Sequence, residues 1–169
     1  FNDDIFALTE NRLREMGQLL RGLEIQYSIS MRLDGLSAGH LAILEETGCQ
    51  VLLVGVETAS QKIGQLIDKK MNQRKFQTNL ELCKKSRLVV SFNFIHGYYG
   101  ENEETLKETK DFLIKNRILY TSFYATAYPD TRLYAMVRDR IPDEEAYVRA
   151  LSRADLQTDY VLNLSEISE

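Results

Sequence analysis

The feature that most constrains the fold is a recurring pattern in which an apolar run is followed by a turn and an amphipathic stretch. Four runs have the composition or alternation of β-strands: residues 25–33, 51–56, 88–95 and 120–127. The run at 51–56 is almost entirely β-branched residues and leucine, which is typical of a strand buried on both faces. Strands that alternate with helices predict an α/β fold with a parallel sheet and helices outside it.

The stretches between these strands have the three- and four-residue apolar spacing of helices. They lie at residues 9–23, 60–67, 76–86 and 103–115. Ser37 is a predicted cap for a further helix that ends near Gly48, Asn102 caps the 103–115 helix, and Pro142 begins a final helix. With the end of a fifth strand expected before Phe1, this pattern fits either an open doubly wound sheet or part of a closed barrel.

Composition narrows the class of protein. The chain has 169 residues, of which 44% are hydrophobic and 27% charged, as in one globular domain. Its net charge of −4 disfavours nonspecific binding to nucleic acid or to an anionic membrane. No apolar run approaches the roughly 20 residues of a membrane helix, and the chain does not open with a signal peptide. The chain also lacks an initiator methionine, which suggests a fragment, a processed chain or a trimmed one. We expect a cytoplasmic location.

The cysteine content argues against a metal site in this chain. Cys49 and Cys83 lie far apart and form no C-x-x-C pair, which predicts two buried thiols in a reducing cytoplasm. An iron–sulfur cluster takes three or four thiolates. With only His40 and His96 besides, the sequence predicts no metal site within these residues.

Polar residues gather at the predicted carboxyl ends of the strands, where active sites form in both candidate architectures. They are Asp3 and Asp4, then Ser30, Arg32 and Asp34, then Glu57 and Ser60, then residues 96–101, and finally residues 124–131. Buried polar groups are costly unless they are paired. This clustering favours a site for a polar ligand over a purely structural network.

Several of these residues also have a structural interpretation. Glu57 could pair with Arg32 in the interior, and Asp3 and Asp4 could cap the helix near Thr9.

His96 alternates with Phe92 and Phe94, so it is predicted to face the helices as a hydrogen-bonded structural histidine. Lys69 and Lys70 are predicted to form a solvated charge pair. No nucleophile elbow, phosphate-binding loop or zinc-protease motif occurs.

Five motifs in order resemble the radical S-adenosylmethionine (SAM) superfamily, and especially its cobalamin-binding branch, which includes anaerobic magnesium-protoporphyrin monomethyl ester cyclase-like Fe–S oxidoreductases. They are D-D-I-F at 3–6, R-L-D at 32–34, G-V-E-T-A-S at 55–60, F-I-H-G-Y-Y-G-E-N at 94–102 and P-D-T at 129–131. The resemblance spans essentially the whole chain. It implies a partial TIM-like (β/α) barrel, namely strands two to six of a six-stranded radical SAM barrel, over residues 1–135, with a C-terminal helical extension over 136–169.

The resemblance also implies roles for the residues that match these motifs. Asp3 and Asp4 would lie near the SAM amino group. Arg32 would pair with the SAM carboxylate, assisted by Ser30. Glu57 would accept hydrogen bonds from the ribose hydroxyls.

The remaining implied contacts lie beside the ribose and around the adenine. Ser60 would lie next to Glu57, and Ile95 and Gly97 would pack near the adenine. Tyr124 would line the same end of the barrel.

Some positions depart from the family pattern. Tyr99 replaces the usual proline, Asn102 a threonine and Asp130 a glycine, while His96 stands where an apolar residue is common. The C-x-x-x-C-x-x-C loop, whose thiolates hold the [4Fe–4S] cluster, does not occur in this chain.

The resemblance therefore implies a fragment of a radical SAM enzyme, an oxidoreductase, cyclase or methyltransferase, whose parent protein cleaves SAM reductively to a 5′-deoxyadenosyl radical. The fragment would supply most of the SAM-contacting shell, and a segment outside it would hold the cluster. Cobalamin, a small-molecule substrate and a flavodoxin or ferredoxin are expected to serve the parent protein. The fragment alone is expected to be inactive and to self-associate through an exposed strand edge.

Two alternatives remain open from the residues themselves. One is a noncatalytic binding or scaffold module with the shape of the barrel. The other is a (β/α) enzyme that uses Glu57 and Asp34 in acid–base chemistry, which would require the two carboxylates to converge.

Overall fold

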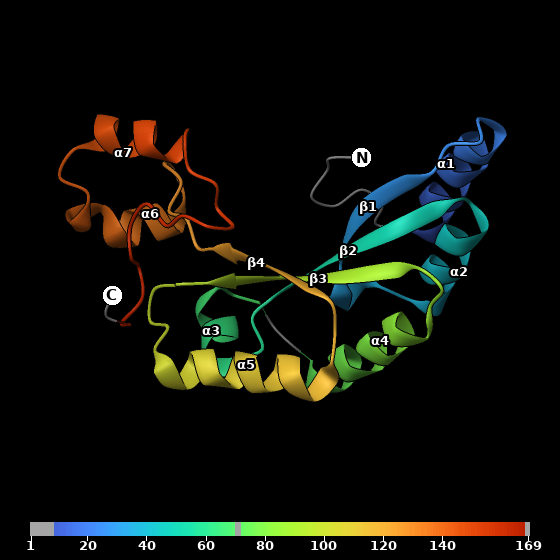
Figure 1. Ribbon diagram of the computed structural model, residues 1–169, viewed down its shortest axis with the longest axis horizontal. Helices are drawn as coiled ribbons and strands as arrows, with labels where there is room; N and C mark the ends of the chain where they lie inside the picture. The colour runs from blue at the N-terminus through green and yellow to red at the C-terminus, as the bar shows by residue number, and fades with distance from the viewer. Residues whose placement is uncertain (1–8, 70–71, 168–169) are drawn as a thin grey trace. The chain divides into compact units, whose positions relative to one another are not determined.

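The computed structural model describes residues 9–69 and 72–167 and contains a four-stranded sheet (Figure 1). The strands are β1 (Tyr27–Arg32), β2 (Cys49–Glu57), β3 (Val89–His96) and β4 (Tyr120–Tyr124), and their order in the sheet is β1-β2-β3-β4. β1 and β2 pair in parallel, from Tyr27 opposite Cys49 to Arg32 opposite Gly55. Spatial order follows chain order with helices between the strands, which confirms the predicted α/β fold.

The helices also follow the sequence pattern closely. They are α1 (Glu10–Gly22), α2 (Ala38–Glu46), α3 (Gln61–Leu66), α4 (Gln73–Lys85), α5 (Glu103–Asn116), α6 (Arg132–Val137) and α7 (Glu144–Leu151), with 3₁₀ turns η1 (Leu33–Gly35) and η2 (Arg138–Arg140). The predicted caps are confirmed: Ser37 accepts a hydrogen bond from the His40 amide at 3.1 Å, and Asn102 accepts one from the Thr105 amide at 3.1 Å. Helix α6, which Thr131 caps, was not predicted.

The chain divides into two compact units. The first comprises the described residues within 1–56, 70–93 and 116–120. In it, α1 packs against α2 where Gly17 lies opposite the side chain of Thr47. The Thr47 hydroxyl donates to the carbonyl of Ile43 at 2.7 Å and also bonds the Tyr27 hydroxyl at 2.7 Å. These two bonds tie the end of α2 to the beginning of β1.

The second unit comprises residues 57–69, 94–115 and 121–167 of the described chain. Its core combines residues after β4 with α6, α7 and the C-terminal segment: Ala125, Ala127, Tyr134, Val137, Ile141, Tyr147 and Leu164. The Tyr147 hydroxyl donates to the carbonyl of Ala127 at 2.9 Å, which fixes α7 to the chain after β4. The Tyr124 amide donates to the carbonyl of Leu156 at 2.8 Å.

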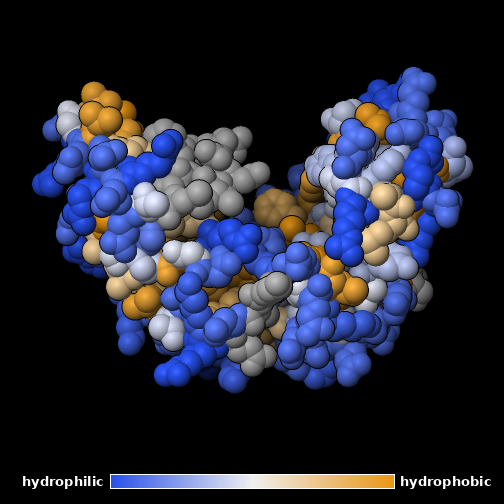
Figure 2. Space-filling view, turned by 180° about the vertical axis from the view of Figure 1, so that it is seen from behind, coloured by the Kyte–Doolittle hydropathy of each residue, from blue (hydrophilic) through white to orange (hydrophobic). Residues whose placement is uncertain are grey.

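The surface is largely hydrophilic with interspersed apolar groups, as Figure 2 shows for one face. Among residues 9–69 and 72–167, no helix is both long enough and apolar enough to cross a bilayer.

Candidate functional site

The predicted site residues of the first unit lie at the end of β1. Ser30 is half-buried, and Arg32 is exposed. The Arg32 guanidinium holds Asp34 through two hydrogen bonds, Nε to Oδ1 at 3.0 Å and Nη2 to Oδ2 at 2.8 Å. The η1 turn that follows β1 brings Asp34 back to Arg32, so this strand end presents a charge pair. Asp3 and Asp4 lie outside the described residues.

The predicted site residues of the second unit begin with Glu57, the last residue of β2. Its backbone has a φ of 69°, in the left-handed region that L residues rarely adopt. Its Oε1 atom accepts a hydrogen bond from Lys69 Nζ at 3.1 Å. The two side chains are 27% and 14% exposed. A carboxylate therefore stands at the strand end in a strained conformation, held by a mostly buried cation.

This pair corrects a prediction. Lys69 was predicted to be solvated, but its side chain is largely buried against Glu57. The two residues are twelve positions apart and become neighbours because the short helix α3 turns the chain back after β2. That return is a tertiary effect, which the local charge pattern of the sequence does not reveal.

The β2–α3 loop is tied to α5 by hydroxyl groups. Thr109 accepts a hydrogen bond from the Ala59 amide at 3.3 Å, and its hydroxyl lies 3.5 Å from that of Thr58. Ser60 is fully buried, and its amide donates to Thr58 Oγ1 at 3.1 Å. Its own Oγ atom has no hydrogen-bond partner among the described residues. The loop that carries Glu57 is therefore anchored.

The loop after β3 turns at two glycines with positive φ, Gly97 at 78° and Gly100 at 80°. Glu101 closes this loop: its side chain is buried, and its Oε2 atom accepts a hydrogen bond from the Gly97 amide at 2.5 Å. Burial raises the pKa of the Glu101 carboxyl, while the bond from Gly97 acts in the opposite direction. Glu101 is not among the predicted ligand contacts, although its place between a loop glycine, Gly100, and a helix cap, Asn102, is a signal in the sequence.

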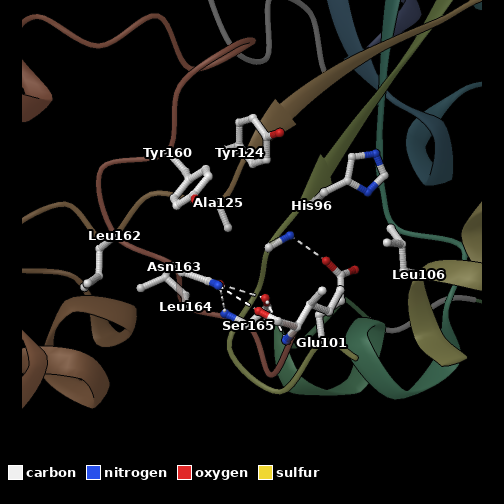
Figure 3. A pocket seen from close by; sticks show the side chains of 12 residues that line it. His96, Glu101, Leu106, Tyr124, Ala125, Tyr160, Leu162, Asn163, Leu164 and Ser165 are labelled. Atoms are coloured by element: carbon white, nitrogen blue, oxygen red, sulfur yellow. Dashed lines mark hydrogen bonds between the residues drawn. The ribbon is translucent and has the colours of Figure 1, made fainter. Parts of the chain in front are cut away.

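A pocket of about 230 Å³ lies within the second unit (Figure 3). Two of the predicted site residues, Gly97 and Tyr124, line it together. The rings of Tyr124 and Tyr160 are 5.5 Å apart between centroids. Ile95, by contrast, packs against the core cluster that contains Ala125 and Tyr134. The structure thus brings Gly97 and Tyr124 together in one cavity; their roles toward an adenine stay predictions.

The two cysteines are free and buried, as predicted. Burial raises the pKa of Cys49 to about 11 and that of Cys83 to about 12, so both are neutral thiols at physiological pH. Within residues 9–69 and 72–167, no group of three or more His, Cys, Asp or Glu side chains could hold a metal ion. These residues therefore do not fit an iron–sulfur cluster. A carboxylate at a strand end and a glycine loop do fit the hydroxyl and amine groups of a nucleoside ligand.

Residues 1–113 match the sequence profile of the Radical SAM superfamily. An uncharacterized methyltransferase of Pyrococcus horikoshii is 31% identical over 137 residues, which are 79% of this chain and 30% of that protein. Bacteriochlorophyllide d C-12(1)-methyltransferase of Chlorobaculum tepidum is 22% identical over 144 residues, 83% of this chain and 32% of that enzyme. The chain thus spans about a third of the length of these curated relatives.

Solved structures share the fold. The radical SAM methyltransferase TsrM of Kitasatospora setae, with cobalamin and a [4Fe–4S] cluster bound, matches with a TM-score of 0.65 and 13% identity, over 78% of this chain and 27% of TsrM. Coproporphyrinogen III oxidase of Escherichia coli, a radical SAM enzyme, matches with a TM-score of 0.66 and 16% identity, over 86% of this chain and 36% of the oxidase. These matches confirm the predicted partial radical SAM barrel. The profile match covers more than half of the residues, and the chain therefore belongs to the radical SAM superfamily.

Proposed function

We propose that this chain forms part of the SAM-binding barrel of an enzyme that cleaves SAM reductively and transfers a methyl group to a small-molecule substrate. The observation that carries the proposal is Glu57, a carboxylate at the carboxyl end of β2 within the segment that matches the family. In a parallel α/β fold this is the end at which ligands bind.

Glu57 is suited to hold a ribose. A carboxylate accepts hydrogen bonds only, and two adjacent hydroxyls can each donate one to it. Lys69 Nζ donates to Glu57 Oε1 at 3.1 Å, a charge-assisted hydrogen bond that fixes one oxygen of the carboxylate. Lys69 is thus expected to orient the carboxylate before the ligand arrives.

Arg32 supplies a second recognition element in this proposal. Its guanidinium presents the planar donor fork that suits a carboxylate, and it already holds one in Asp34. The SAM carboxylate would become its partner or share it with Asp34. Gly97, without a side chain, would let the adenine approach the β3 loop.

Methyl transfer is favoured over the oxidoreductase or cyclase reactions because both curated relatives above carry methyltransferase names. The resemblance to TsrM, a methyltransferase solved with cobalamin, supports the same reaction and a cobalamin requirement. In this family a reduced [4Fe–4S] cluster supplies the electron that cleaves SAM. The ligands of that cluster would be cysteines outside the residues described here.

The test uses the intact protein, purified and reconstituted with iron and sulfide under anaerobic conditions. Reduction in the presence of SAM should release 5′-deoxyadenosine or S-adenosylhomocysteine, and failure to form either would contradict the proposal. Glu57→Gln should weaken SAM binding about tenfold or more, since a hydrogen bond to a charged group contributes roughly 1.5–3 kcal/mol. Glu46→Gln, at an exposed position that ends α2, is the matched control and should bind SAM normally.

A further inference from the structure

The pocket of the second unit contains polar atoms that the proposed SAM site does not use. Its walls come from the end of β3, the beginning of α5, the end of β4 and the C-terminal segment. Its volume of about 230 Å³ far exceeds the roughly 30 Å³ that one water molecule takes. The cavity is therefore large enough for a small organic molecule.

Part of the pocket wall comes from helix α5 and the strand residues that face it. Phe94 of β3 packs toward α5, with its ring centroid 6.2 Å from that of Phe112. His96 follows two residues later on the same alternating face, and Leu106 of α5 lines the pocket beside it. Two predicted SAM contacts, Gly97 and Tyr124, line the same pocket, whereas His96 and Glu101 are not among the predicted SAM contacts.

Most polar groups that line the pocket are already satisfied. Asn163 donates to the carbonyl of Ile167 at 2.8 Å, and its Oδ1 atom accepts bonds from the amide and hydroxyl of Ser165, at 3.0 and 2.8 Å. Two atoms are different. Glu101 Oε1 and His96 Nδ1 are both buried and have no hydrogen-bond partner among the described residues.

The two atoms belong to side chains that line the same pocket. Figure 3 draws the His96 ring and the Glu101 carboxylate among the lining side chains. Glu101 is 1% exposed, and its other oxygen is fixed by the Gly97 amide, so the carboxylate cannot turn away to reach water. A buried acceptor without a donor costs about 1–3 kcal/mol, and more when it is charged.

The charges of the side chains that line the pocket indicate which kind of hydrogen-bond donor would bind to Glu101. Among the described residues, neither lysine nor arginine lines the pocket. Burial lowers the pKa of His96, which is therefore a neutral imidazole at physiological pH. Glu101, the only acid among the described residues that line the cavity, thus has no counter-charge from them. A cationic ligand would supply both the missing donor and the missing charge.

The remaining side chains that line the pocket favour a ligand whose main part is apolar or aromatic. Tyr124 and Tyr160 present two aromatic rings, and Leu106, Leu162 and Leu164 complete an apolar wall. Aromatic faces attract both apolar groups and organic cations.

We propose that this pocket binds a small organic cation, an amine or amidine with an aromatic or alicyclic body, whose nitrogen donates to Glu101 Oε1 and contacts His96 Nδ1. The site does not depend on SAM cleavage or on a cluster. Its failure and that of the proposed function are therefore distinguishable.

The probes are benzamidine, which is an amidinium, and benzamide, its neutral counterpart of nearly the same shape. Titration calorimetry on the intact protein should show benzamidine binding at least tenfold more tightly than benzamide. Glu101→Gln should remove that preference, because the amide can still accept from the Gly97 amide but presents a donor to the ligand. Glu103→Gln, which changes an exposed acid at the beginning of α5, two residues after Glu101, should preserve it. Equal affinity for the two probes, or an unchanged preference in Glu101→Gln, would overturn the proposal.

A second measurement needs no variant that could misfold. The chain has two histidines, so NMR of the imidazole rings reports each separately. Benzamidine should shift the ring signals of His96 and leave those of His40, which lies in the other unit on α2, unchanged. Equal shifts at both rings, or none at His96, would also overturn the proposal.

Discussion

At the scale of single residues, the site depends on side chains whose partners are distant in sequence. The position of Glu57 at the end of a strand could be predicted from the sequence. A buried apolar run that is followed by a glycine and an acid predicts that the strand ends there. Its partner Lys69 could not, because the pairing depends on how α3 returns the chain. Helix α6 escaped prediction for a related reason: six residues carry too little periodicity, and only its Thr131 cap signalled it.

The burial of Glu101 has a consequence for stability. Its pKa is raised in the folded protein, so the folded state holds the proton over a pH range in which the unfolded state has lost it. The free energy of unfolding should therefore fall as pH rises from the unfolded pKa through the folded one. Glu101→Gln cannot ionise and should gain stability relative to wild type on going from acidic to neutral pH.

Urea unfolding of both proteins at the two pH values measures this difference. Glu103→Gln, whose carboxyl is exposed, should show no such trend. A Glu101→Gln difference that is the same at both pH values would show that the carboxyl titrates normally in the folded state.

At the scale of helices and strands, most boundaries could be predicted within two or three residues because caps and periodicity are local signals. β4 is the exception: it ends at Tyr124 although the apolar alternation continues to Ala127. After Tyr124 the chain leaves the strand, and Ala125 and Ala127 enter the core around α6 and α7 instead. Alternation of apolar residues with a period of two cannot distinguish a continuing strand from a segment that leaves the sheet and enters a core.

The contact between α1 and α2 gives a prediction at this scale. A Cβ atom at Gly17 would lie 2.5 Å from Thr47 Cγ2, and Thr47 is held by its bonds to Ile43 and Tyr27. Gly17→Ala should therefore destabilise the protein by about 1–3 kcal/mol through overpacking. Thermal or urea unfolding measures the change.

The same helix offers the control. Gly22 has open space where a Cβ would lie, so Gly22→Ala should be neutral or stabilise by up to about 1 kcal/mol through helix propensity. If both substitutions stabilised the protein, the close packing of α1 on Thr47 would be contradicted.

At the scale of the whole molecule, the sheet order leaves β1 at one edge, with β2 as its only neighbour among the described strands. A strand at the edge of a sheet is a common site for pairing with a strand of another chain. We predict that this chain by itself self-associates as its concentration rises, as sedimentation velocity would measure. A monomer at all concentrations that also unfolds in one sharp thermal transition would contradict this.

The opposite edge of the sheet is formed by β4, and part of it is covered. The Tyr124 amide of β4 is occupied by the carbonyl of Leu156, so the segment after α7 covers this part of that edge. Association is therefore expected at β1 rather than at this part of β4.

The backbone conformation of Glu57 reduces the stability of the fold, while its side chain is proposed to bind the ligand. At a φ of 69° glycine would fold with less strain, since a non-glycine residue there costs on the order of 1 kcal/mol. Glu57→Gly would relieve that strain, but it would also remove the carboxylate that pairs with the largely buried Lys69 and that is proposed to bind the ligand. Thermostability screens should therefore measure SAM binding as well, because any substitution that removes this carboxylate removes the proposed ligand contact.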